Sequence, residues 1–344
     1  MFRLGVFAGA AAALATVVAL PADAHAHARA QQIVLCSQTA LSNAITQANT
    51  VPGPALLFLA PGCTYTLTAP NNPGNGLPVV TSDITIVGSQ NIIRRQSAAA
   101  FRIFKVSGPN ARLSLSNLTV RDGRSGGEGG GGIYVDTGSA LTLNSVEVTR
   151  NLSAVSGIGA GIANFGTLTL RNSTVSYNIS TNNGGGIFTN GTANISNTTI
   201  TGNTAHDDAG GIDARGSLTL ANSRVTDNAA RVGAGGILAF NLTGTVTDTL
   251  IRGNTLAGDG QDGGGIFNRT STLTLERTTV FANRALGSGA RGGGLANASD
   301  ATLTVRNSSV THNFANAAPG GIFNNGGTLS LVATLVQDNQ PTDL

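Results

Sequence analysis

The densest group of titratable side chains in this 344-residue chain lies between His206 and Arg215. Three of them, Asp208, Asp213 and Arg215, are candidate catalytic residues for chemistry on a sugar chain. Carboxylates can hold Ca²⁺ on an acidic sugar while a base removes a proton, which is lyase chemistry. Two carboxylates that face one groove can instead hydrolyse a glycosidic bond. The same three residues also fit a solvated loop with an Asp–Arg ion pair at positions i and i+2.

The elements that would position these residues belong to a repeat. From Ala111 onward one sequence motif recurs at intervals of about 25 to 30 residues, which is typical of a solenoid. Three consecutive copies of 25 residues begin at Gly166, Gly191 and Gly216 and read GTLTLRNSTVSYNISTNNGGGIFTN, GTANISNTTITGNTAHDDAGGIDAR and GSLTLANSRVTDNAARVGAGGILAF.

The pattern within one repeat predicts short strands. Leu218 and Leu220 alternate with polar residues, and Val225 follows in a second apolar position. A unit of 25 residues is too short for a strand, a helix and a return, and no helical period is present. We therefore predict one coil of a parallel β-helix per repeat, with each strand paired to its equivalent in the next coil.

Asparagine occupies two columns of the repeat. Asn tolerates left-handed backbone geometry, so the column that follows a Val or Ile by three positions is predicted to lie at a sharp turn between strands. Stacked amides can also hydrogen-bond along the axis as a structural ladder. The predicted ladder contains the residues that follow a Val or Ile by three positions: Asn151, Asn178, Asn203, Asn228, Asn254, Asn283, Asn313 and Asn339. The second column contains Asn117, Asn172, Asn197, Asn222 and Asn307.

These phrases resemble a known class of proteins. The GGI-x-N and TLTLxNSTVSxN patterns resemble the right-handed parallel β-helix repeats of the pectin-lyase-like superfamily, especially the polymorphic-outer-membrane-protein type. The segment LCSQTALSNAITQANTVPGPALLFLAPGCTYTLT resembles the N-terminal cap of secreted bacterial β-helix proteins. The resemblance implies an all-β, single-stranded right-handed parallel β-helix with an N-terminal capping helix. It leaves the function open, because the superfamily holds lyases, polygalacturonases and adhesins. The signature patterns of the lyases and polygalacturonases are not recognisable in this chain.

Three segments are expected along the chain. Residues 1–30 have the features of a signal peptide, with Arg3 before an apolar run and small-x-small triplets after it. A retained membrane helix is the alternative. Residues 31–60 are predicted to form the cap, with a helix capped by Ser37 or Thr39. Residues 61–344 are predicted to form the β-helix, with regular repeats from residue 111.

The two cysteines, Cys36 and Cys63, are expected to form a disulfide, because the chain is predicted to be secreted and extracellular. With two thiolates, no zinc cluster can be built from cysteine.

A second candidate site follows from the strand after Gly-Gly. If its Ile points inward, the next residue points outward, and this column reads Tyr134, Ala163, Phe188, Asp213, Leu238, Phe267, Ala296 and Phe323. Its aromatic members, Tyr134, Phe188, Phe267 and Phe323, are the candidate ligand-binding residues, because aromatic rings pack on the apolar faces of sugars. The alternative is that loops fold over the column and bury it.

Expectations for ions and partners are limited. Asp259 and Asp262 lie in a short glycine-rich acidic loop with few Ca²⁺ ligands, so no cofactor is expected beyond an optional Ca²⁺. The net charge of +3 includes no Lys/Arg cluster, which argues against nucleic-acid binding. After signal removal the chain is not expected to be embedded in a membrane. The last coil lacks a visible cap, so this end is expected either to pair with a partner, which could be a second copy of the chain, or to fray locally.

We interpret the sequence as a secreted scaffold or binding module that engages polysaccharide or cell-envelope material along a lateral face. One alternative is a polysaccharide lyase or glycoside hydrolase that acts through residues 207–215. A surface adhesin is the second alternative.

Overall fold

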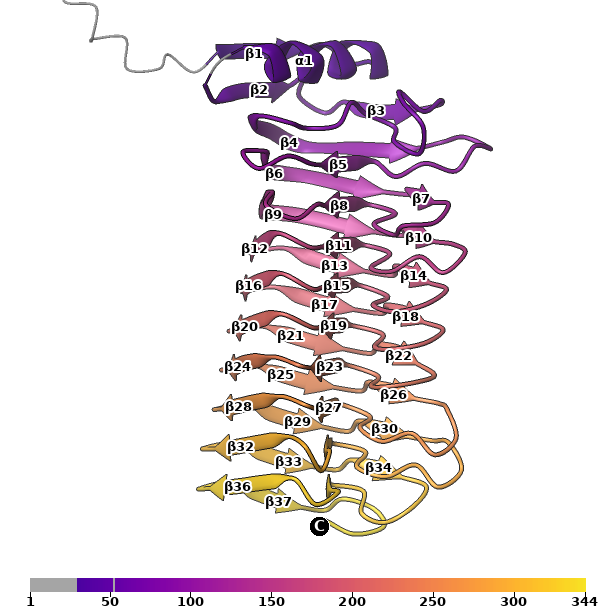
Figure 1. Cartoon of the computed structure of the whole chain (residues 1–344), viewed down its shortest axis with the longest axis vertical. Helices are drawn as coiled ribbons and strands as arrows, with labels where there is room; N and C mark the ends of the chain where they lie inside the picture. The colour runs from indigo at the N-terminus through magenta and orange to yellow at the C-terminus, as the bar shows by residue number, and fades with distance from the viewer. Residues whose placement is uncertain (1–29, 52) are drawn as a thin grey trace, which may run out of the picture.

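The computed structural model describes residues 30–51 and 53–344. The predicted signal peptide therefore lies outside the described residues, apart from Ala30. The described chain winds into a right-handed solenoid of about 11 turns, with the cap at one end and the C-terminus at the other (Figure 1). The predicted fold class is confirmed.

The strands form three parallel sheets that run the length of the solenoid. The long sheet contains β1 (Ala30–Val34), β2 (Ala55–Leu59), β3 (Thr64–Leu67), β4 (Asp83–Arg95), β6 (Arg112–Arg121), β9 (Ala140–Thr149), β12 (Thr167–Arg171), β13 (Thr174–Ser176), β16 (Thr192–Ser196), β17 (Thr199–Thr201), β20 (Ser217–Ala221), β21 (Arg224–Thr226), β24 (Thr243–Thr247), β25 (Leu250–Arg252), β28 (Thr272–Glu276), β29 (Thr279–Phe281), β32 (Thr302–Arg306), β33 (Ser309–Thr311), β36 (Thr328–Val332) and β37 (Leu335–Gln337). The eight-stranded sheet contains β7 (Arg124–Ser125), β10 (Leu152–Ser153), β14 (Ile179–Ser180), β18 (Thr204–Ala205), β22 (Ala229–Ala230), β26 (Thr255–Leu256), β30 (Arg284–Ala285) and β34 (Phe314–Ala315). The nine-stranded sheet contains β5 (Phe104–Val106), β8 (Ile133–Val135), β11 (Ile162–Asn164), β15 (Ile187–Thr189), β19 (Ile212–Ala214), β23 (Ile237–Phe240), β27 (Ile266–Arg269), β31 (Leu295–Asn297) and β35 (Ile322–Asn324).

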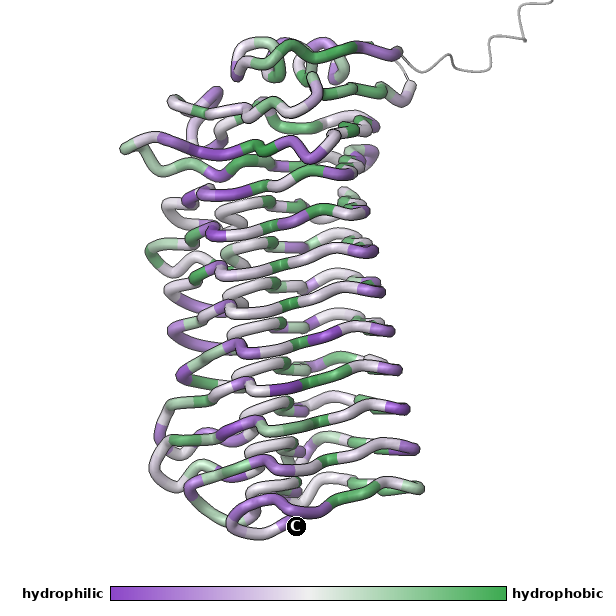
Figure 2. Tube along the Cα trace, turned by 180° about the vertical axis from the view of Figure 1, so that it is seen from behind, coloured by the Kyte–Doolittle hydropathy of each residue, from purple (hydrophilic) through white to green (hydrophobic). Residues whose placement is uncertain are grey.

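Each strand pairs with its equivalent one coil away, so the sequence repeat becomes a spatial stack. Leu168 pairs with Ala193 and Leu170 with Ile195 in the long sheet, and all four side chains are buried. Alternating residues enter the core between the sheets, which is the burial pattern that the period-two alternation predicts. Figure 2 shows the same alternation along the coils as green segments separated by white and purple ones.

The ladder asparagines form a continuous buried file along the axis. Each Nδ2 from Asn151 to Asn313 donates to the Oδ1 of the next ladder asparagine at 2.9 to 3.0 Å. The backbone N–H of each donates to the same oxygen at 2.9 to 3.1 Å. These bonds satisfy amides that would otherwise be buried without partners.

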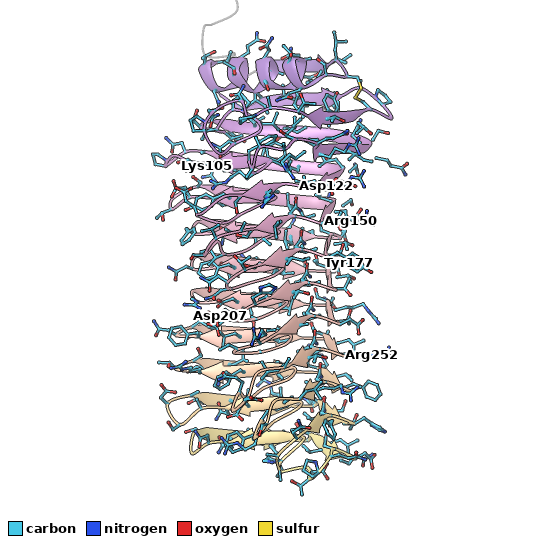
Figure 3. The ribbon with its side chains drawn as sticks, turned by 90° about the vertical axis from the view of Figure 1, so that its right-hand side faces the viewer. Lys105, Asp122, Arg150, Tyr177, Asp207 and Arg252 are labelled. Carbon is cyan, nitrogen blue, oxygen red and sulfur yellow. A yellow bond between two sulfur atoms is a disulfide. The ribbon has the colours of Figure 1, made fainter. Side chains whose placement is uncertain are left out.

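The bend beside the ladder corrects one expectation. The residue before each ladder asparagine takes the positive φ, as at Tyr177 (φ 53°) and Asp227 (φ 54°), while the ladder asparagine itself does not. In Figure 3, Arg150 and Tyr177 mark two such bends along one side of the solenoid, and Asp122 (φ 61°) marks the equivalent bend before Gly123. The second asparagine column does adopt left-handed geometry, for example at Asn172 (φ 50°). The ladder asparagine is therefore selected by its amide hydrogen bonds.

The N-terminal end is closed by β1 and the helix α1 (Gln38–Thr50). The Ser37 side chain accepts a hydrogen bond from the Ala40 N–H at 3.1 Å and is the N-cap. The predicted apolar face of the helix is buried: Leu41, Ala44, Ile45 and Ala48. Cys36 and Cys63 form a disulfide that ties the start of the helix to the chain just before β3. Within the described residues, no helix is long and apolar enough to cross a membrane.

At the other end, β36 and β37 have no strand beyond them among the described residues. Val332 and Leu335 are about half exposed there. The final residues fold back under this coil, and the Asp343 carboxylate accepts a hydrogen bond from Asn339 Nδ2 at 2.8 Å. Asp343 thus occupies the next ladder position. Self-association through this end stays a prediction.

Candidate binding face on the nine-stranded sheet

The predicted catalytic residues meet on the outer side of the nine-stranded sheet. Arg215 Nε donates to Asp213 Oδ1 at 3.0 Å, and Arg215 Nη2 donates to Asp213 Oδ2 at 2.9 Å. The same Nη2 reaches Asp208 Oδ2 at 3.1 Å. Asp213 lies in β19 and Asp208 in the preceding loop, so one guanidinium joins the loop to the strand. Two carboxylates and one cation are therefore mutually engaged.

Burial dominates the electrostatics of this cluster. The Asp213 side chain is 0% exposed, and its burial raises the pKa of the carboxyl to about 6 although the Arg215 hydrogen bonds oppose the shift. Burial also raises the pKa of Asp208, and the neighbouring Asp207 charge adds to this effect. His206 is exposed and makes no ion pair with a described residue. The sequence cluster thus reduces to a trio of Asp208, Asp213 and Arg215.

The trio is part of a longer stack of side chains. The rings of Tyr134 and Phe165 are 5.5 Å apart, and those of Phe165 and Phe188 are 5.7 Å apart. The Arg215 guanidinium lies 5.4 Å from the Phe188 ring and 5.4 Å from the Phe240 ring.

Positively charged side chains lie at both ends of this stack of rings. Arg269 lies 5.4 Å from the Phe240 ring, and Arg102 and Lys105 lie 4.8 and 5.2 Å from the Tyr134 ring. We call this set the aromatic–arginine column: Arg102, Lys105, Tyr134, Phe165, Phe188, Arg215, Phe240 and Arg269.

The predicted aromatic stripe is only partly present. Tyr134 and Phe188 belong to the column, but Phe188 is only 6% exposed. Phe267 packs on the Leu238 cluster, and Phe323 lies beneath Arg291, whose guanidinium is 3.8 Å from its ring. The remaining members of the predicted outward column are buried: Ala163, Asp213, Leu238 and Ala296. Most of this column is therefore buried, which agrees with the alternative that loops fold over it, and the ligand-binding role of its aromatic residues stays a prediction.

Five column residues are not predicted from the sequence: Arg102, Lys105, Phe165, Phe240 and Arg269. Phe165 and Phe240 lie two positions beyond the outward residue of their strands, at the position that Arg215 and Arg269 occupy in other coils. Aligning that position between repeats would have found them, since it reads Phe165, Asn190, Arg215, Phe240 and Arg269. Each of these coils therefore has a second outward position, which β23 and β27 include and which directly follows β11 and β19.

The predicted acidic Ca²⁺ loop makes contacts with the next coil. Asp259 Oδ1 accepts from the Ser288 N–H at 2.7 Å. Asp262 Oδ1 accepts from the Arg291 N–H at 3.0 Å and from Arg291 Nε at 3.3 Å. Across residues 30–51 and 53–344 no group of three or more His, Cys, Asp or Glu side chains could hold a metal ion. Ca²⁺ binding stays a prediction without a defined site.

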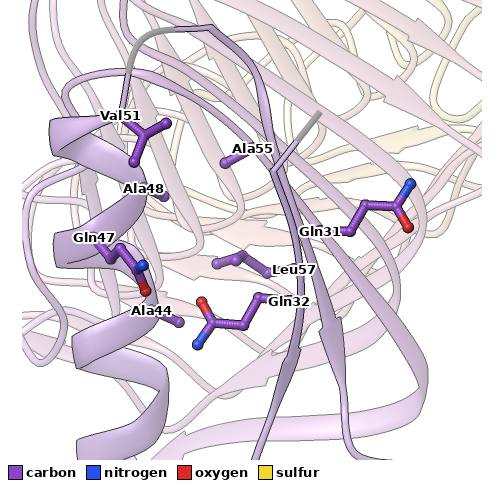
Figure 4. A pocket seen from close by; sticks show the side chains of 8 residues that line it. All are labelled: Gln31, Gln32, Ala44, Gln47, Ala48, Val51, Ala55 and Leu57. Carbon is purple, nitrogen blue, oxygen red and sulfur yellow. The ribbon is translucent and has the colours of Figure 1, made fainter. Parts of the chain in front are cut away.

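A hollow of about 330 Å³ lies in the cap, between α1 and the first strands (Figure 4). Ala44, Ala48 and Leu57 form its buried floor, and Gln31 and Gln32 lie at its rim. It contains none of the predicted site residues and lies far along the chain from the trio.

Fold and site together define a right-handed parallel β-helix with a lateral side-chain column. Residues 131–336 match the family described as the right handed beta helix region, and the chain belongs to this family. No curated protein matches the chain.

Several solved structures are similar to this chain. The A-module of the mannuronan C-5 epimerase AlgE4 from Azotobacter vinelandii has a TM-score of 0.48 and 14% identity, covering 89% of this chain and 94% of that one. The Dettilon tailspike protein has a TM-score of 0.42 and 12% identity, with 86% and 64% covered. The alginate lyase from Paenibacillus sp. str. FPU-7 has a TM-score of 0.40 and 12% identity, with 89% and 99% covered.

Proposed function

We propose that the protein is a secreted, non-catalytic module that binds polysaccharide along the aromatic–arginine column. The observation that carries this proposal is the unbroken series of ring and guanidinium contacts from Arg102 to Arg269. Aromatic faces pack on the apolar faces of sugar rings, while guanidinium groups donate hydrogen bonds to hydroxyls or carboxylates.

The length of the column suits a chain-like ligand. It follows the coils from β5 to β27, and a strand spacing of about 4.8 Å gives an axial extent of roughly 30 Å. A polysaccharide aligned with the solenoid axis would contact several column residues in succession. Arg215 Nη1 donates to none of the described residues, so it is free to bind a ligand oxygen.

The geometry of the trio supports binding over catalysis. A general acid or base must reach the proton that it transfers. The Asp213 carboxylate has no exposed surface, and both of its oxygens accept hydrogen bonds from Arg215. Asp208 is engaged by the same guanidinium. Location outside the cell is supported by the Cys36–Cys63 disulfide, since disulfides persist in oxidising compartments.

The test is to incubate the protein with insoluble and acidic polysaccharides, with and without Ca²⁺. Depletion of the protein and release of shortened or unsaturated products are measured together. We expect depletion without products, and weaker depletion for Tyr134→Ala and Phe165→Ala. Phe281→Ala is the matched control, because this half-buried aromatic lies on β29 in the long sheet and outside the column. Equal melting temperatures would show that the variants fold.

Two other outcomes would change the proposed function. Products that disappear in Asp213→Ala would make the protein a lyase or hydrolase. Absence of both depletion and products would contradict the proposal and favour an adhesin-like role with a protein partner.

A further inference from the structure

One end of the aromatic–arginine column holds two positively charged side chains against a single ring. Arg102 and Lys105 lie 4.8 and 5.2 Å from the Tyr134 ring. Both also contact the carboxylate of Glu128. Arg102 Nη1 donates to Glu128 Oε2 at 3.1 Å, and Lys105 Nζ lies 3.6 Å from the same oxygen. A carboxylate of the protein itself therefore occupies the place where these two cations could bind an anionic ligand.

Glu128 belongs to an exposed, glycine-rich loop. It follows Gly126 and Gly127, where an added Cβ would meet no atom within 4 Å. These two glycines and Glu128 are exposed, whereas Gly130 is buried and its N–H donates to Ile158 O at 2.9 Å. The backbone is thus held just after Glu128 and is open just before it. Rotation at the two glycines can therefore carry the carboxylate away from the cations.

The cations are more deeply buried than the carboxylate that pairs with them. The side chain of Arg102 is 6% exposed and that of Lys105 is 23% exposed, while that of Glu128 is 61% exposed. Arg102 Nε is buried and has no hydrogen-bond partner among the described residues. Loss of an anion is costly for a buried guanidinium, whereas an exposed carboxylate loses little when it returns to water. This place therefore requires an anion, but the anion can be exchanged.

The ion pair in the middle of the column is different. Asp213, the carboxylate that pairs with Arg215, lies within β19 and has a side chain with no exposed surface. It cannot leave the guanidinium without unfolding its strand. Among the column ion pairs that the structure describes, the one with the most exposed carboxylate is the pair at Glu128.

We propose that Arg102 and Lys105 form an anion subsite of the column and that Glu128 is its internal occupant, which a carboxylate or sulfate group on a polysaccharide must displace. This inference rests on the polysaccharide binding proposed above. The Arg102 hydrogen bond holds the pKa of Glu128 below its ordinary value, so the internal carboxylate is charged at neutral pH. A group on a short flexible tether competes at an effective concentration on the order of millimolar. Glu128 thus weakens the binding of acidic chains and leaves that of neutral chains unchanged.

The test compares Glu128→Gln with the wild-type chain in binding to dextran, carboxymethyl-dextran and dextran sulfate, which share one backbone. Removal of the competing charge should tighten binding of at least one charged polymer by about fivefold at low salt. Binding of dextran should not change. The gain should shrink as added salt screens the charges. A gain for carboxymethyl-dextran alone would identify the anion as a carboxylate, and a gain for dextran sulfate alone would identify it as a sulfate.

Matched variants separate the subsite from the net charge of the protein. Glu147→Gln makes the same charge change at an exposed position of β9 in the long sheet and should leave all three affinities unchanged. Glu128→Gln/Lys105→Gln should lose the gain, because one of the two cations is absent. Equal gains for Glu128→Gln and Glu147→Gln would overturn the proposal, since the effect would then come from net charge. A Glu128→Gln variant that binds the charged polymers no more tightly than the wild type would also overturn it.

This proposal and the proposed function can fail separately. Wild-type binding that Phe165→Ala weakens and Glu128→Gln does not change would retain the polysaccharide-binding column and reject the anion subsite. A gain in Glu128→Gln that Phe165→Ala does not reduce would retain the subsite and reject the column. Absence of binding to any of the three polymers, in the wild type and in Glu128→Gln, would overturn the subsite. The wider polysaccharide panel would then decide the proposed function.

Discussion

Asp213 holds Arg215 between two aromatic rings. The guanidinium makes paired hydrogen bonds of 3.0 and 2.9 Å to the two oxygens of the buried carboxylate, and it lies 5.4 Å from the rings of both Phe188 and Phe240. Arg215 thereby takes the place of an aromatic side chain in its coil. Asp213 acts as a positioning residue, because it has no exposed surface of its own.

Removing only the carboxylate should destabilise the fold. Asp213→Ala leaves the half-buried Arg215 with Asp208 as its single partner, and we expect the free energy of unfolding to fall by about 2 kcal/mol. The double variant Asp213→Leu/Arg215→Phe copies Leu238 and Phe240 of the next coil and should stay within about 1 kcal/mol of the wild type. Urea unfolding of both variants checks this. A double variant as unstable as Asp213→Ala would show that the ion pair itself is required.

Stability should depend on pH through Asp213. Its pKa is about 6 in the folded state against an ordinary value of 3.8, so the folded protein binds the extra proton between these values. The stabilisation from this group is therefore present below about pH 4 and is lost as the pH rises through about 6.

Asp213→Asn provides the reference, because its side chain at position 213 cannot titrate. The other acidic groups contribute equally to the pH dependence of both proteins, so their contributions cancel in the difference. From pH 4 to pH 7 the unfolding free energy of the wild type should fall relative to this variant, by up to about 3 kcal/mol. Urea unfolding at four pH values measures the difference. A difference that rises with pH would mean that the Arg215 ion pair outweighs burial.

The asparagine ladder should be sensitive at its centre. Asn228 Oδ1 accepts from both the N–H and Nδ2 of Asn203, and Asn228 Nδ2 donates to Ile200 O and to Asn254 Oδ1. Asn228→Ala leaves these buried groups without partners, so we expect a loss of roughly 3 to 5 kcal/mol. Asn194→Ala, on the exposed side of β16, should change stability by less than about 0.5 kcal/mol. Thermal and urea unfolding measure the stability of the two variants. Similar losses of unfolding free energy in both would show that the ladder hydrogen bonds contribute no more to stability than an exposed asparagine.

The disulfide should stabilise the cap locally. It closes a separation of 27 residues, and the chain-entropy model gives about 3 kcal/mol for such a loop. Because each coil contacts only its neighbours, Cys36→Ser/Cys63→Ser should speed amide exchange in β1 and α1 and leave the central ladder protected. Hydrogen-exchange mass spectrometry reads both regions in one experiment. Uniform deprotection along the solenoid would indicate that the cap controls the whole fold.

The cap contains one element that its sequence predicts and one that it does not. The helical spacing of Leu41, Ala44, Ile45 and Ala48 located α1 correctly, since a single amphipathic helix has its own period. Strand β1 was not anticipated, because Gln31 and Gln32 interrupt any apolar alternation there. That strand forms through its pairing with β2, which is a contact between distant parts of the chain.

The sequence by itself determined the architecture, because a 25-residue unit with period-two alternation has few ways to bury its apolar face. Leu218, Leu220 and Val225 specify the inward side of their coil before any coil is stacked. Only the tertiary structure decided what lies on the outside. The exposure of Phe188, Phe240 and Arg215 depends on how the preceding loops pack against the nine-stranded sheet. Their contact partners depend on which side chains the stacking of coils brings together. Those distances arise between residues of different coils, and no local pattern encodes them.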